Sequence, residues 1–546
     1  MNTNSRRHIG NSLQLIIGIG LIAILVNLGM PAGSEAAETR PSKPNVVLIL
    51  ADDLGFSDIG CYGGEISTPN LDRLASDGVR LSQMYNTARC WPTRACLMTG
   101  YYAQQVNRDP ARQRPGWAAL LPELLKPAGY RSYHSGKWHV DGKVLAGGFD
   151  RSYSFEDHDR YFTPRKHLLD DEPLPAVNSG DGYYATTAIA QHAIDFLAGH
   201  ATEHRDQPFF LYLAFVSPHF PLHALPEDIA RYRDRYLEGW DAIRGQRARR
   251  LHKSGVVDSG LSALDPQFTP RYLKPDLLGK IGPGEAERAV SWKDLTPVQQ
   301  RFQATKMAIH AAMVDRMDRE IGRVLDQLRS MGAWENTLIV FLSDNGADAT
   351  LMVRGDGHDQ SASPGSAESF LCLGPGWASA ANAPFRRHKI WVHEGGISTS
   401  CILHWPGVIP SGGKVRHAPT HIVDFVPTVL ELTGATSPGN WGGQTRPAMP
   451  GKSLVPLFKK DATIPREAIY WNHEGNRALR IGNWKLVSES EKKGGWELYD
   501  LKRDRIESKN LALAQPERVE QMSAVWQQMD DEFRRQSGAE KGVKSQ

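Results

Sequence analysis

Three uninterrupted apolar runs are the feature that most constrains how this chain folds. They are NVVLILA at 45–51, FFLYLAFV at 209–216 and TLIVFL at 337–342, with a weaker fourth run at 130–135. Runs of this length, rich in β-branched and aromatic residues, are typical of strands buried on both faces of a parallel sheet. The stretch 305–331 carries apolar residues at steps of three and four, which predicts an amphipathic helix. We therefore expect an α/β fold, in which helices sandwich a large, mostly parallel sheet.

The pattern changes after about residue 466. Short apolar stretches joined by polar turns give way to a helical pattern at 516–535, which predicts a smaller, antiparallel α+β domain. A chain of 546 residues is long enough for one large domain and a second, smaller one. We place the large domain at 42–465, the C-terminal domain at 466–535 and a frayed tail at 536–546. The Arg-rich stretch 232–253 is interpreted as a helix with a solvated face. The short C-terminal strands are expected at 468–471, 478–481, 484–487 and 496–499.

The N-terminus has the layout of a secretory signal. Two arginines precede an apolar stretch at 13–30, and small residues follow at plausible cleavage positions. Residues 1–36 are therefore predicted to be a signal peptide of a periplasmic or secreted protein, with no stable membrane span after cleavage. The alternative is an uncleaved anchor, because the stretch is long for a signal. The formal net charge of +3 gives no reason to expect a nucleic-acid partner.

The cysteine count is odd, which argues against a pure disulfide framework. A chain of this size does not need disulfides to fold, so at least one cysteine is expected to have another role. No spacing resembles a zinc site. The five cysteines are Cys61, Cys90, Cys96, Cys372 and Cys401.

Polar side chains follow each predicted strand. In open α/β sheets, ligands bind at the carboxyl ends of the strands, so these side chains are expected to converge. The two acidic ends supply only oxygen ligands, which suits a hard cation such as Ca²⁺ or Mg²⁺. Helix capping is the simpler interpretation of one such pair, but two pairs at two strand ends favour a metal. Lys137 and His139 are two residues apart and would point the same way in an extended segment. The acidic set is Asp52, Asp53, Asp344 and Asn345.

The most specific motif is CWPTRACLMTG at 90–100. Pro92 favours the first turn of a helix, and Cys90 is predicted to lie just before that helix, where free N–H groups favour an anion. Arg94 is four residues further on, within reach of the same face. A bare C-x-P-x-R is often incidental, but the continuation through Leu97 to Gly100 argues against chance.

With this motif, the chain resembles the type I sulfatases of the alkaline phosphatase superfamily, and most closely their bacterial arylsulfatase branch. The resemblance extends from about residue 44 to about residue 535. The other matching segments, in order, are DDLG (52–55), TPNLD (68–72), GKWH (136–139), SPHFP (217–221), SDNG (343–346), FRRHK (385–389) and HEGG (393–396).

The resemblance implies a modified cysteine and a calcium ion. Cys90 would be converted to formylglycine by a formylglycine-generating enzyme during export. Calcium would be held by Asp52, Asp53, Asp344 and Asn345 together with the modified Cys90. One hydroxyl of the hydrated formylglycine would attack sulfur, and the other would then expel sulfate, a step that a plain Cys or Ser cannot perform.

The resemblance also implies roles for the remaining core residues. Arg94 and Lys137 would stabilise the formylglycine and the sulfate oxygens, and His139 would act as the base in the elimination. His219 and Lys389 would bind the sulfate together with Lys137, and His219 is the favoured acid for the departing alcohol. The substrate would be a sulfate ester, and by analogy a sulfated carbohydrate.

This chain departs from many relatives after Glu394-Gly395-Gly396, where 397–399 reads IST and lacks their arginine. We expect this difference to affect packing or substrate choice, and we expect His223 to be structural. His388, His393 and His473 are candidates for lining the pocket.

Two other functions stay open at this point. One is a phosphodiesterase or phosphonate monoester hydrolase of the same superfamily, against which the full set of lysines and histidines favours sulfate. The other is a sulfated-glycan-binding protein without catalysis, which would need a broken core set. No member of that set is missing.

Overall fold

The computed structural model describes residues 43–271, 273, 276–490 and 495–538. Within these residues, a large mixed sheet has the strand order β10-β2-β9-β8-β1-β7-β3-β4-β5-β6, and β11 also pairs with β2. Its strands are β1 (Asn45–Ala51), β2 (Val79–Tyr85), β3 (Arg131–Gly136), β4 (Arg151–Phe155), β5 (His167–Leu169), β6 (Glu172–Pro173), β7 (Phe209–Ala214), β8 (Thr337–Ser343), β9 (Ser398–His404), β10 (Lys414–Arg416) and β11 (Thr420–His421).

The four predicted strands form the middle of this sheet. β1 pairs in parallel with β7 and β8, and β3 pairs in parallel with β7. The antiparallel β9 then extends the sheet beyond β8. The prediction of a mostly parallel sheet is confirmed, and the carboxyl ends of β1, β3, β7 and β8 lie along one edge.

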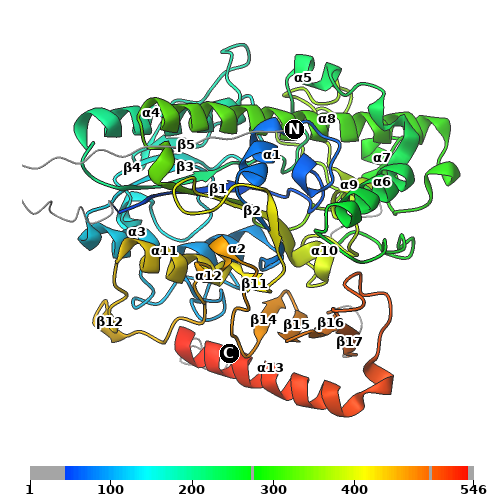
Figure 1. Ribbon diagram of the computed structural model, residues 1–546. Helices are drawn as coiled ribbons and strands as arrows, with labels where there is room; N and C mark the ends of the chain where they lie inside the picture. Colours follow the sequence, from blue (N-terminus) through cyan, green and yellow to red (C-terminus); the bar gives the residue numbers. More distant parts are fainter. Residues whose placement is uncertain (1–42, 272, 274–275, 491–494, 539–546) are drawn as a thin grey trace, which may run out of the picture. The chain divides into compact units, whose positions relative to one another are not determined.

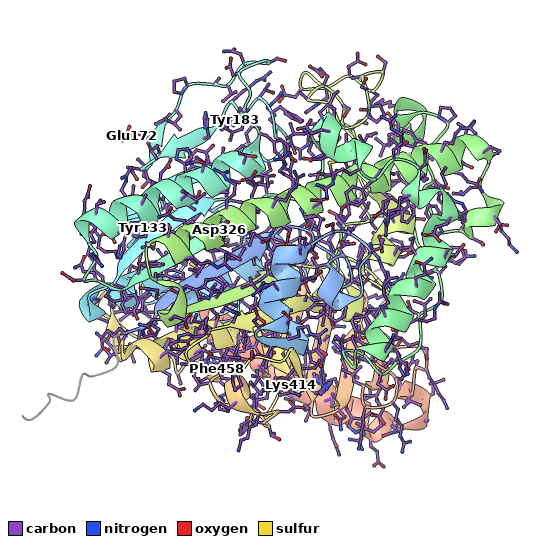
Figure 2. All side chains as sticks on the ribbon, turned by 45° about the horizontal axis from the view of Figure 1, so that its top comes forward. Tyr133, Glu172, Tyr183, Asp326, Lys414 and Phe458 are labelled. Carbon is purple, nitrogen blue, oxygen red and sulfur yellow. The ribbon has the colours of Figure 1, made fainter. Side chains whose placement is uncertain are left out.

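Helices cover both faces of the sheet (Figure 1). Val47 and Ile49 of β1 point into one core with α4 and α8, whereas Val46 and Leu48 point into a second core with α2, α3 and α11. Figure 2 shows side chains filling both layers, and its labels include Tyr133 of the first core and Phe458 of the second. The helices are α1 (Pro69–Ser76), α2 (Cys90–Thr99), α3 (Leu121–Leu125), α4 (Ala185–Glu203), α5 (Pro226–Ala230), α6 (Gly239–Lys253), α7 (Leu277–Ile281), α8 (Pro297–Ser330), α9 (Gly374–Ala381), α10 (Glu394–Ile397), α11 (Phe425–Thr433), α12 (Pro456–Lys459) and α13 (Pro516–Ser537).

The long helix α8 begins earlier than its apolar pattern predicts. The pattern indicates a start at Thr305, but the helix starts at Pro297. Thr296 caps it, because its hydroxyl accepts from the Gln299 N–H and the Gln299 side chain accepts from the Thr296 N–H. This reciprocal capping box, with Pro at the first helical position, is a start signal that the hydrophobic period does not contain.

The C-terminal part is an antiparallel sheet covered by α13, as predicted (Figure 1). The apolar side chains of one face belong to the same core as the even positions of β1, so this sheet shares part of its core with the large one. Those of the other face form a separate cluster with residues that include Tyr85 and Ile397. The predicted boundary at 465/466 stays a prediction. α13 extends to Ser537 and so includes Gln536, the first residue of the predicted tail. The Gln536 carbonyl accepts from Trp117 Nε1 at 3.2 Å, which attaches this last turn to the large domain. The strands are β14 (Ile469–His473), β15 (Asn476–Ile481), β16 (Trp484–Ser488) and β17 (Glu497–Asp500), and a separate hairpin pairs β12 (Asn440–Trp441) with β13 (Gln444–Thr445).

The prediction of a solvated Arg-rich helix is wrong for part of α6. Arg244 and Arg247 are buried on the side of the helix that packs against α9. Arg247 reaches Asp58 at 2.7 Å and Glu65 at 2.8 Å, so acids from the segment after β1 make its burial possible. The number of arginines could not reveal which of them meet buried carboxylates.

The predicted signal peptide, residues 1–36, lies outside the described residues. Among the residues that the structure describes, no helix combines the length and the apolar character needed to cross a membrane.

Candidate active site

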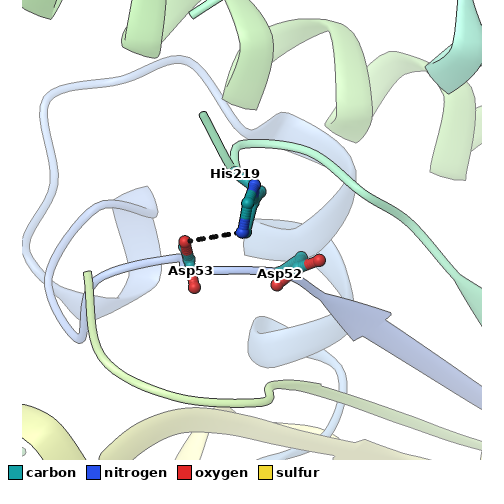
Figure 3. Close-up of side chains that lie close together, drawn as sticks. All are labelled: Asp52, Asp53 and His219. Atoms are coloured by element: carbon teal, nitrogen blue, oxygen red, sulfur yellow. Dashed lines mark ion pairs between the residues drawn. The ribbon is translucent and has the colours of Figure 1, made fainter. Parts of the chain in front are cut away.

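Acidic, basic and imidazole side chains converge where the parallel strands end. Asp52 and Asp53 follow β1, and His219 follows β7, and all three are buried (Figure 3). Lys137 follows β3 and Asp344 follows β8, so both reach the same edge of the sheet. The structure therefore brings together residues that lie far apart in the sequence, as the strand pattern predicts.

The carboxylates at this edge are only partly paired. Asp52 Oδ2 accepts from Lys137 Nζ at 2.5 Å, and Asp53 Oδ1 accepts from Lys389 Nζ at 2.6 Å and from Asn345 Nδ2 at 2.6 Å. The remaining oxygens, Asp52 Oδ1, Asp53 Oδ2 and Asn345 Oδ1, are buried without a hydrogen-bond donor. Buried oxygens without donors are rare in proteins, and this set is the kind that a hard cation binds. The predicted oxygen ligands therefore fit a hard cation such as calcium.

His219 approaches the same group. Its Nε2 lies 3.6 Å from Asp53 Oδ2, and ligand atoms of Asp52, Asp53 and His219 all lie within 4.8 Å of one another. His219 Nδ1 lies 2.6 Å from the Phe220 carbonyl oxygen, which fixes the orientation of the ring. Nitrogen is a poorer ligand than oxygen for a hard cation, so we assign the cation to the oxygens.

Asp53 also has an unusual backbone conformation. Its φ is 65°, in the left-handed region that residues other than glycine seldom occupy. Its N–H points at Asp344 Oδ1, 3.3 Å away, which ties the end of β1 to the end of β8. Strained conformations of this kind occur at functional sites, where the surrounding structure maintains them.

Arg94 is entirely buried and holds other site residues in place. Its Nε and Nη2 donate to Asp344 Oδ2 at 3.0 and 2.8 Å, and its Nη1 donates to the Lys137 carbonyl at 2.8 Å. Nη2 also lies 3.6 Å from Asp52 Oδ2. The guanidinium therefore fixes the ends of β8 and β3 relative to α2.

Cys90 is the first residue of α2, with Arg89 as the N-cap, and not the residue before the helix as the sequence suggested. It is buried, with 4% of its surface exposed. Burial alone would raise the pKa of its thiol, but the charges of Lys137 and Lys389 lower the pKa below its ordinary value. The position therefore favours a negatively charged group.

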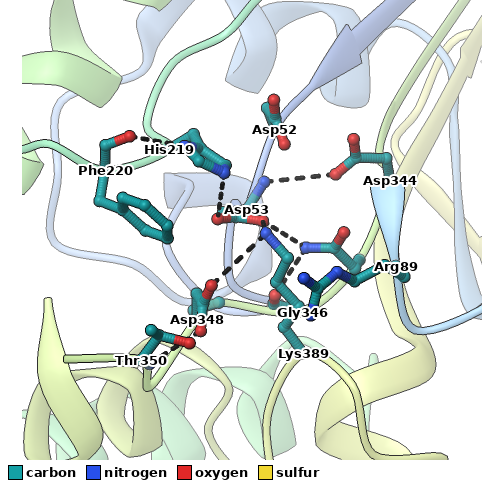
Figure 4. Close-up of polar contacts among 12 residues, drawn as sticks. Asp52, Asp53, Arg89, His219, Phe220, Asp344, Gly346, Asp348, Thr350 and Lys389 are labelled. Carbon is teal, nitrogen blue, oxygen red and sulfur yellow. Dashed lines mark hydrogen bonds and ion pairs between the residues drawn. The ribbon is translucent and has the colours of Figure 1, made fainter. Parts of the chain in front are cut away.

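Lys389 also contacts Asp348, a residue that the sequence analysis did not include in the site. Its Nζ lies 3.4 Å from Asp348 Oδ2, and Asp348 Oδ1 accepts from the Thr350 N–H at 2.8 Å (Figure 4). Burial lowers the pKa of Lys389, but Asp53 and Asp348 raise it above its ordinary value, so the ammonium stays charged. Asp348 could have been predicted from its position, because it lies in the same loop after β8 as Asp344.

Three imidazoles lie beside the acids and lysines. Burial, together with the charge of Lys137, lowers the pKa of both His139 and His158 well below the ordinary value. The ring of His158 lies 5.5 Å from that of His139 and 6.4 Å from that of His219. His158 was missed, because a single histidine in a polar loop gives no signal. The expected extended segment is also wrong, because the φ of His139 is 53°.

The other histidines separate into structural and site-facing ones. His223 is structural, as predicted, because it is buried and its Nε2 lies 2.7 Å from the Ser369 carbonyl oxygen. His388 packs against Phe268, with ring centroids 5.2 Å apart. By contrast, the ring of His473 lies 5.6 Å from that of Trp91, inside the cysteine motif. His393, the third histidine predicted to line the pocket, pairs with the C-terminal part, because its Nε2 lies 3.1 Å from Glu497 Oε2.

The segment 397–399 is hydrogen-bonded to the structure around it, and its expected effect on packing or substrate choice stays a prediction. Thr399 Oγ1 accepts from the Ser343 N–H at 2.8 Å, which holds the end of β8. Ser398 Oγ and Arg505 Nε both donate to Glu394 Oε2, at 3.1 and 3.0 Å. An arginine from the C-terminal part thus pairs with Glu394.

Comparison with known proteins identifies the family. The sulfatase family model matches residues 44–435, and a model of the N-sulphoglucosamine sulphohydrolase C-terminal region matches residues 386–536. An uncharacterized sulfatase of Schizosaccharomyces pombe is 32% identical over 547 residues, covering 91% of this chain and 94% of the relative. An arylsulfatase of Klebsiella aerogenes is 32% identical over 458 residues, covering 76% and 91%.

A solved structure shares the fold. BT4656, in complex with its substrate D-glucosamine-2-N,6-O-disulfate, matches with a TM-score of 0.61 and 22% identity over 90% of this chain and 98% of the other. The chain belongs to the sulfatase family, and its motifs are those of the type I sulfatases of the alkaline phosphatase superfamily. It is therefore a sulfuric ester hydrolase.

Proposed function

We propose that this sulfatase removes sulfate from carbohydrate esters, using a formylglycine made from Cys90 and a bound calcium ion. The observation that carries the proposal is the position of Cys90. It is a buried cysteine at the start of α2, in the field of Lys137 and Lys389. Asp52 and Asp53, which pair with these lysines, each have one buried oxygen without a hydrogen-bond donor.

The calcium ion would be held by Asp52, Asp53, Asp344 and Asn345, together with the modified Cys90. Bound there, calcium supplies positive charge that polarises a sulfate oxygen and favours the deprotonated nucleophile. Three of these side chains present unpartnered oxygens, and Arg94 fixes the fourth, Asp344. A ligand set held by buried hydrogen bonds is already organised before the substrate arrives.

The charged residues around Cys90 are suited to an anionic substrate. Lys389 and Lys137 are buried ammonium groups that would attract the sulfate oxygens, as a sulfate ester requires. His219 carries a lowered pKa, because the effect of burial exceeds that of Asp53. We assign it the proton for the departing alcohol. Because Nδ1 faces the Phe220 carbonyl oxygen, Nε2 can donate only from the protonated ring, and the carboxylate of Asp53, 3.6 Å from Nε2, favours that form.

His139 would be the base that takes a proton during sulfate release. Its pKa is lowered by burial and by Lys137 and Arg94, so it is neutral and free to accept a proton near pH 7. Its Nδ1 is buried without a hydrogen-bond partner. Sulfated carbohydrate as the substrate class is supported by the sulfated glucosamine bound in BT4656.

Peptide mass spectrometry on the fragment that contains Cys90 tests the proposal. Protein from a host with a formylglycine-generating enzyme should show a loss of roughly 18 Da, opposite to the mass gained when cysteine is oxidised by oxygen addition. Sulfate release from 4-nitrophenyl sulfate should track the modified fraction. Cys90→Ala and Cys90→Ser should both lose at least about a hundredfold in rate, because one lacks the nucleophile and the other lacks the second hydroxyl.

Cys61→Ala is the matched control, because Cys61 is half-buried and lies outside the motif. It should retain wild-type activity. Full activity in a protein whose Cys90 peptide is entirely unmodified would refute the proposal.

A further inference from the structure

Three aromatic rings form a continuous group that begins next to the reacting residue. Trp91 directly follows Cys90, and its ring centroid lies 5.9 Å from that of His139 and 5.6 Å from that of His473. Trp91 is half-buried, and the guanidinium of Arg89 lies 4.9 Å from its ring centroid. The group therefore extends from the start of α2 to the last residue of β14 in the C-terminal part.

Each of the three rings has a buried nitrogen without a hydrogen-bond partner. These atoms are Trp91 Nε1, His139 Nδ1 and His473 Nε2. Leaving a buried polar atom unpaired costs about 1–3 kcal/mol, so neighbouring unpaired atoms are unfavourable unless a ligand completes them. His223 and His310 each also have one unpaired buried ring nitrogen, so what distinguishes Trp91, His139 and His473 is that their rings adjoin one another beside Cys90.

The orientation of the His473 ring is fixed by a contact between its Nδ1 and Asp109. Its Nδ1 lies 2.8 Å from Asp109 Oδ2, and Gln104 Nε2 donates to the same oxygen at 3.3 Å. A carboxylate only accepts, so Nδ1 carries a proton, and in this tautomer Nε2 is an acceptor. Glu474 Oε1 lies 3.7 Å from Nε2, and no donor among the described residues is hydrogen-bonded to this nitrogen. Nε2 therefore suits a hydroxyl donor from outside the chain.

A flat indole beside fixed polar atoms is a suitable surface for a sugar. The C–H face of a pyranose packs on an aromatic ring, while its hydroxyls form a few placed hydrogen bonds. A phenyl ring would also stack on Trp91, but it has no hydroxyl for His473. The two ligand classes therefore differ in how far they depend on His473.

We propose that Trp91 and His473 form the subsite for the alcohol part of the sulfate ester. It is specific for a sugar ring that stacks on Trp91 and donates a hydroxyl to His473 Nε2. Asp109 is a positioning residue that keeps Nε2 an acceptor. The inference rests on the proposed function, because it takes Cys90 as the point where the sulfate group lies.

Steady-state kinetics of His473 variants test the hydroxyl contact. The substrates are N-acetylglucosamine 6-sulfate, N-acetylgalactosamine 6-sulfate and galactose 4-sulfate, with 4-nitrophenyl sulfate as the ester without a hydroxyl. His473→Ala should raise KM for the best sugar sulfate about tenfold, the effect of one lost hydrogen bond to a buried acceptor, and should affect the aryl sulfate several-fold less. His473→Gln keeps an acceptor and should recover most of the loss.

Asp109→Asn tests the positioning role. The amide can donate to Nδ1, which moves the ring proton to Nε2 and removes the acceptor without removing a side chain. KM for the sugar sulfate should rise about as much as in His473→Ala, with kcat changed less than KM. A merely structural role for Asp109 would instead change both substrates equally.

Trp91→Phe should retain more sugar affinity than Trp91→Ala, because a smaller ring still stacks. The matched control is His252→Ala. His252 also pairs with an aspartate, Asp258, at 3.1 Å, but both side chains are exposed. This variant should behave as wild type on every substrate.

Binding measurements separate this inference from the proposed function. Calorimetric titration of the Cys90→Ala protein with the same sugar sulfates requires no turnover, and adding His473→Ala should weaken binding about tenfold. His473-dependent binding without any hydrolysis by the modified wild-type protein would support the subsite and refute the proposed function. Two results would overturn the subsite: hydrolysis of 4-nitrophenyl sulfate but of no sugar sulfate, or equal losses on both classes in folded His473→Ala.

Discussion

Two clusters of buried charge lie close to the end of β1, and they differ in how completely they are paired. In the structural cluster, defined as Arg247, Asp58, Glu65 and His310, Arg247 donates to Asp58 Oδ1 at 2.7 Å and to both oxygens of Glu65 at 2.8 Å. Asp58 Oδ2 accepts from the Gly55 N–H at 2.9 Å and lies 3.0 Å from His310 Nε2. Every carboxylate oxygen of this cluster has a partner.

The second cluster consists of Asp52, Asp53, Asn345, Lys137 and Lys389, and we call it the catalytic cluster after the proposed function. Each of its carboxylates is bound to a lysine at one oxygen only. The opposite oxygens of both acids, and the amide oxygen of Asn345, have no donor. The charges of the lysines nevertheless lower the pKa of Asp52 well below its ordinary value, although burial acts in the other direction.

The comparison shows how to distinguish charged residues that stabilise the fold from charged residues that bind a ligand. Both clusters are buried and both contain ion pairs, so burial and ion pairing do not separate them. Completeness of hydrogen bonding at the carboxylate oxygens does, although His310 Nδ1 has no partner, because the energetic cost of an unpaired buried oxygen is removed only when something else binds it.

Exchanging one carboxylate for an amide should abolish activity in the catalytic cluster and lower only the stability in the structural cluster. Asp53→Asn, in the catalytic cluster, has the largest expected effect. Asparagine tolerates the left-handed backbone at this position, and Lys389 keeps Asp348 as a partner. We expect an activity loss of at least about a thousandfold on 4-nitrophenyl sulfate, since substrate and nucleophile lose their charge stabilisation. Calcium content, measured by elemental analysis, should fall with it.

Glu65→Gln is the matched exchange in the structural cluster. It should keep calcium and the activity per folded molecule, but lower the free energy of unfolding. If Asp53→Asn kept full activity, the oxygens without donors would not be the metal site.

Removing the cation of the structural cluster should be the most destabilising change. Arg247→Met leaves Asp58 and Glu65 buried without their main partner, and unpairing a buried ion pair costs about 3–5 kcal/mol. Denaturant unfolding measures this loss. Arg249→Met lies on the exposed side of the same helix and should stay within about 0.5 kcal/mol of wild type. A loss of similar size in Arg249→Met would show that helix propensity, not the cluster, is responsible.

Calcium should stabilise the protein through the catalytic cluster alone. A ligand that binds only the folded state at a hundredfold excess over its Kd adds about 2.7 kcal/mol to the free energy of unfolding. Unfolding in EGTA and in excess calcium should differ by about this amount in wild type and in Glu65→Gln. The difference should disappear in Asp53→Asn. Equal stabilisation in both variants would place the calcium elsewhere.

The sequence was sufficient for the parts of the molecule that rest on periodicity and local motifs. The four buried strands, α13 and the convergence of Asp52, Asp53, Asp344 and His219 at one edge follow from apolar runs and from the geometry of parallel strands. The start of α8 was missed because a capping box is a hydrogen-bond signal and not a hydrophobic one.

What the sequence could not predict depends on contacts between distant segments. Arg247 looks the same as the exposed Arg249 until the acids of another segment are placed beneath it. The same holds for His473, whose partner Asp109 lies far away in the chain. Single polar residues in loops carry no period, so their roles appear only in the folded structure.

The smallest expected effect concerns the pH dependence of the structural cluster. Burial would raise the pKa of Asp58, but His310 and Arg247 outweigh it and lower the pKa from 3.8 to about 2. As the pH falls, the unfolded chain therefore takes up the proton first, and the folded state loses its advantage. Ionised Asp58 contributes about 2 kcal/mol of stability, complete above about pH 4 and lost as the pH falls towards 2. The free energy of unfolding of wild type minus that of Asp58→Asn should shrink over this window. The exposed Asp326→Asn provides the baseline, with a small difference from wild type at every pH. A difference for Asp58→Asn that stayed constant from pH 6 to the acid limit would mean that the Arg247 pair does not depend on the charge of Asp58.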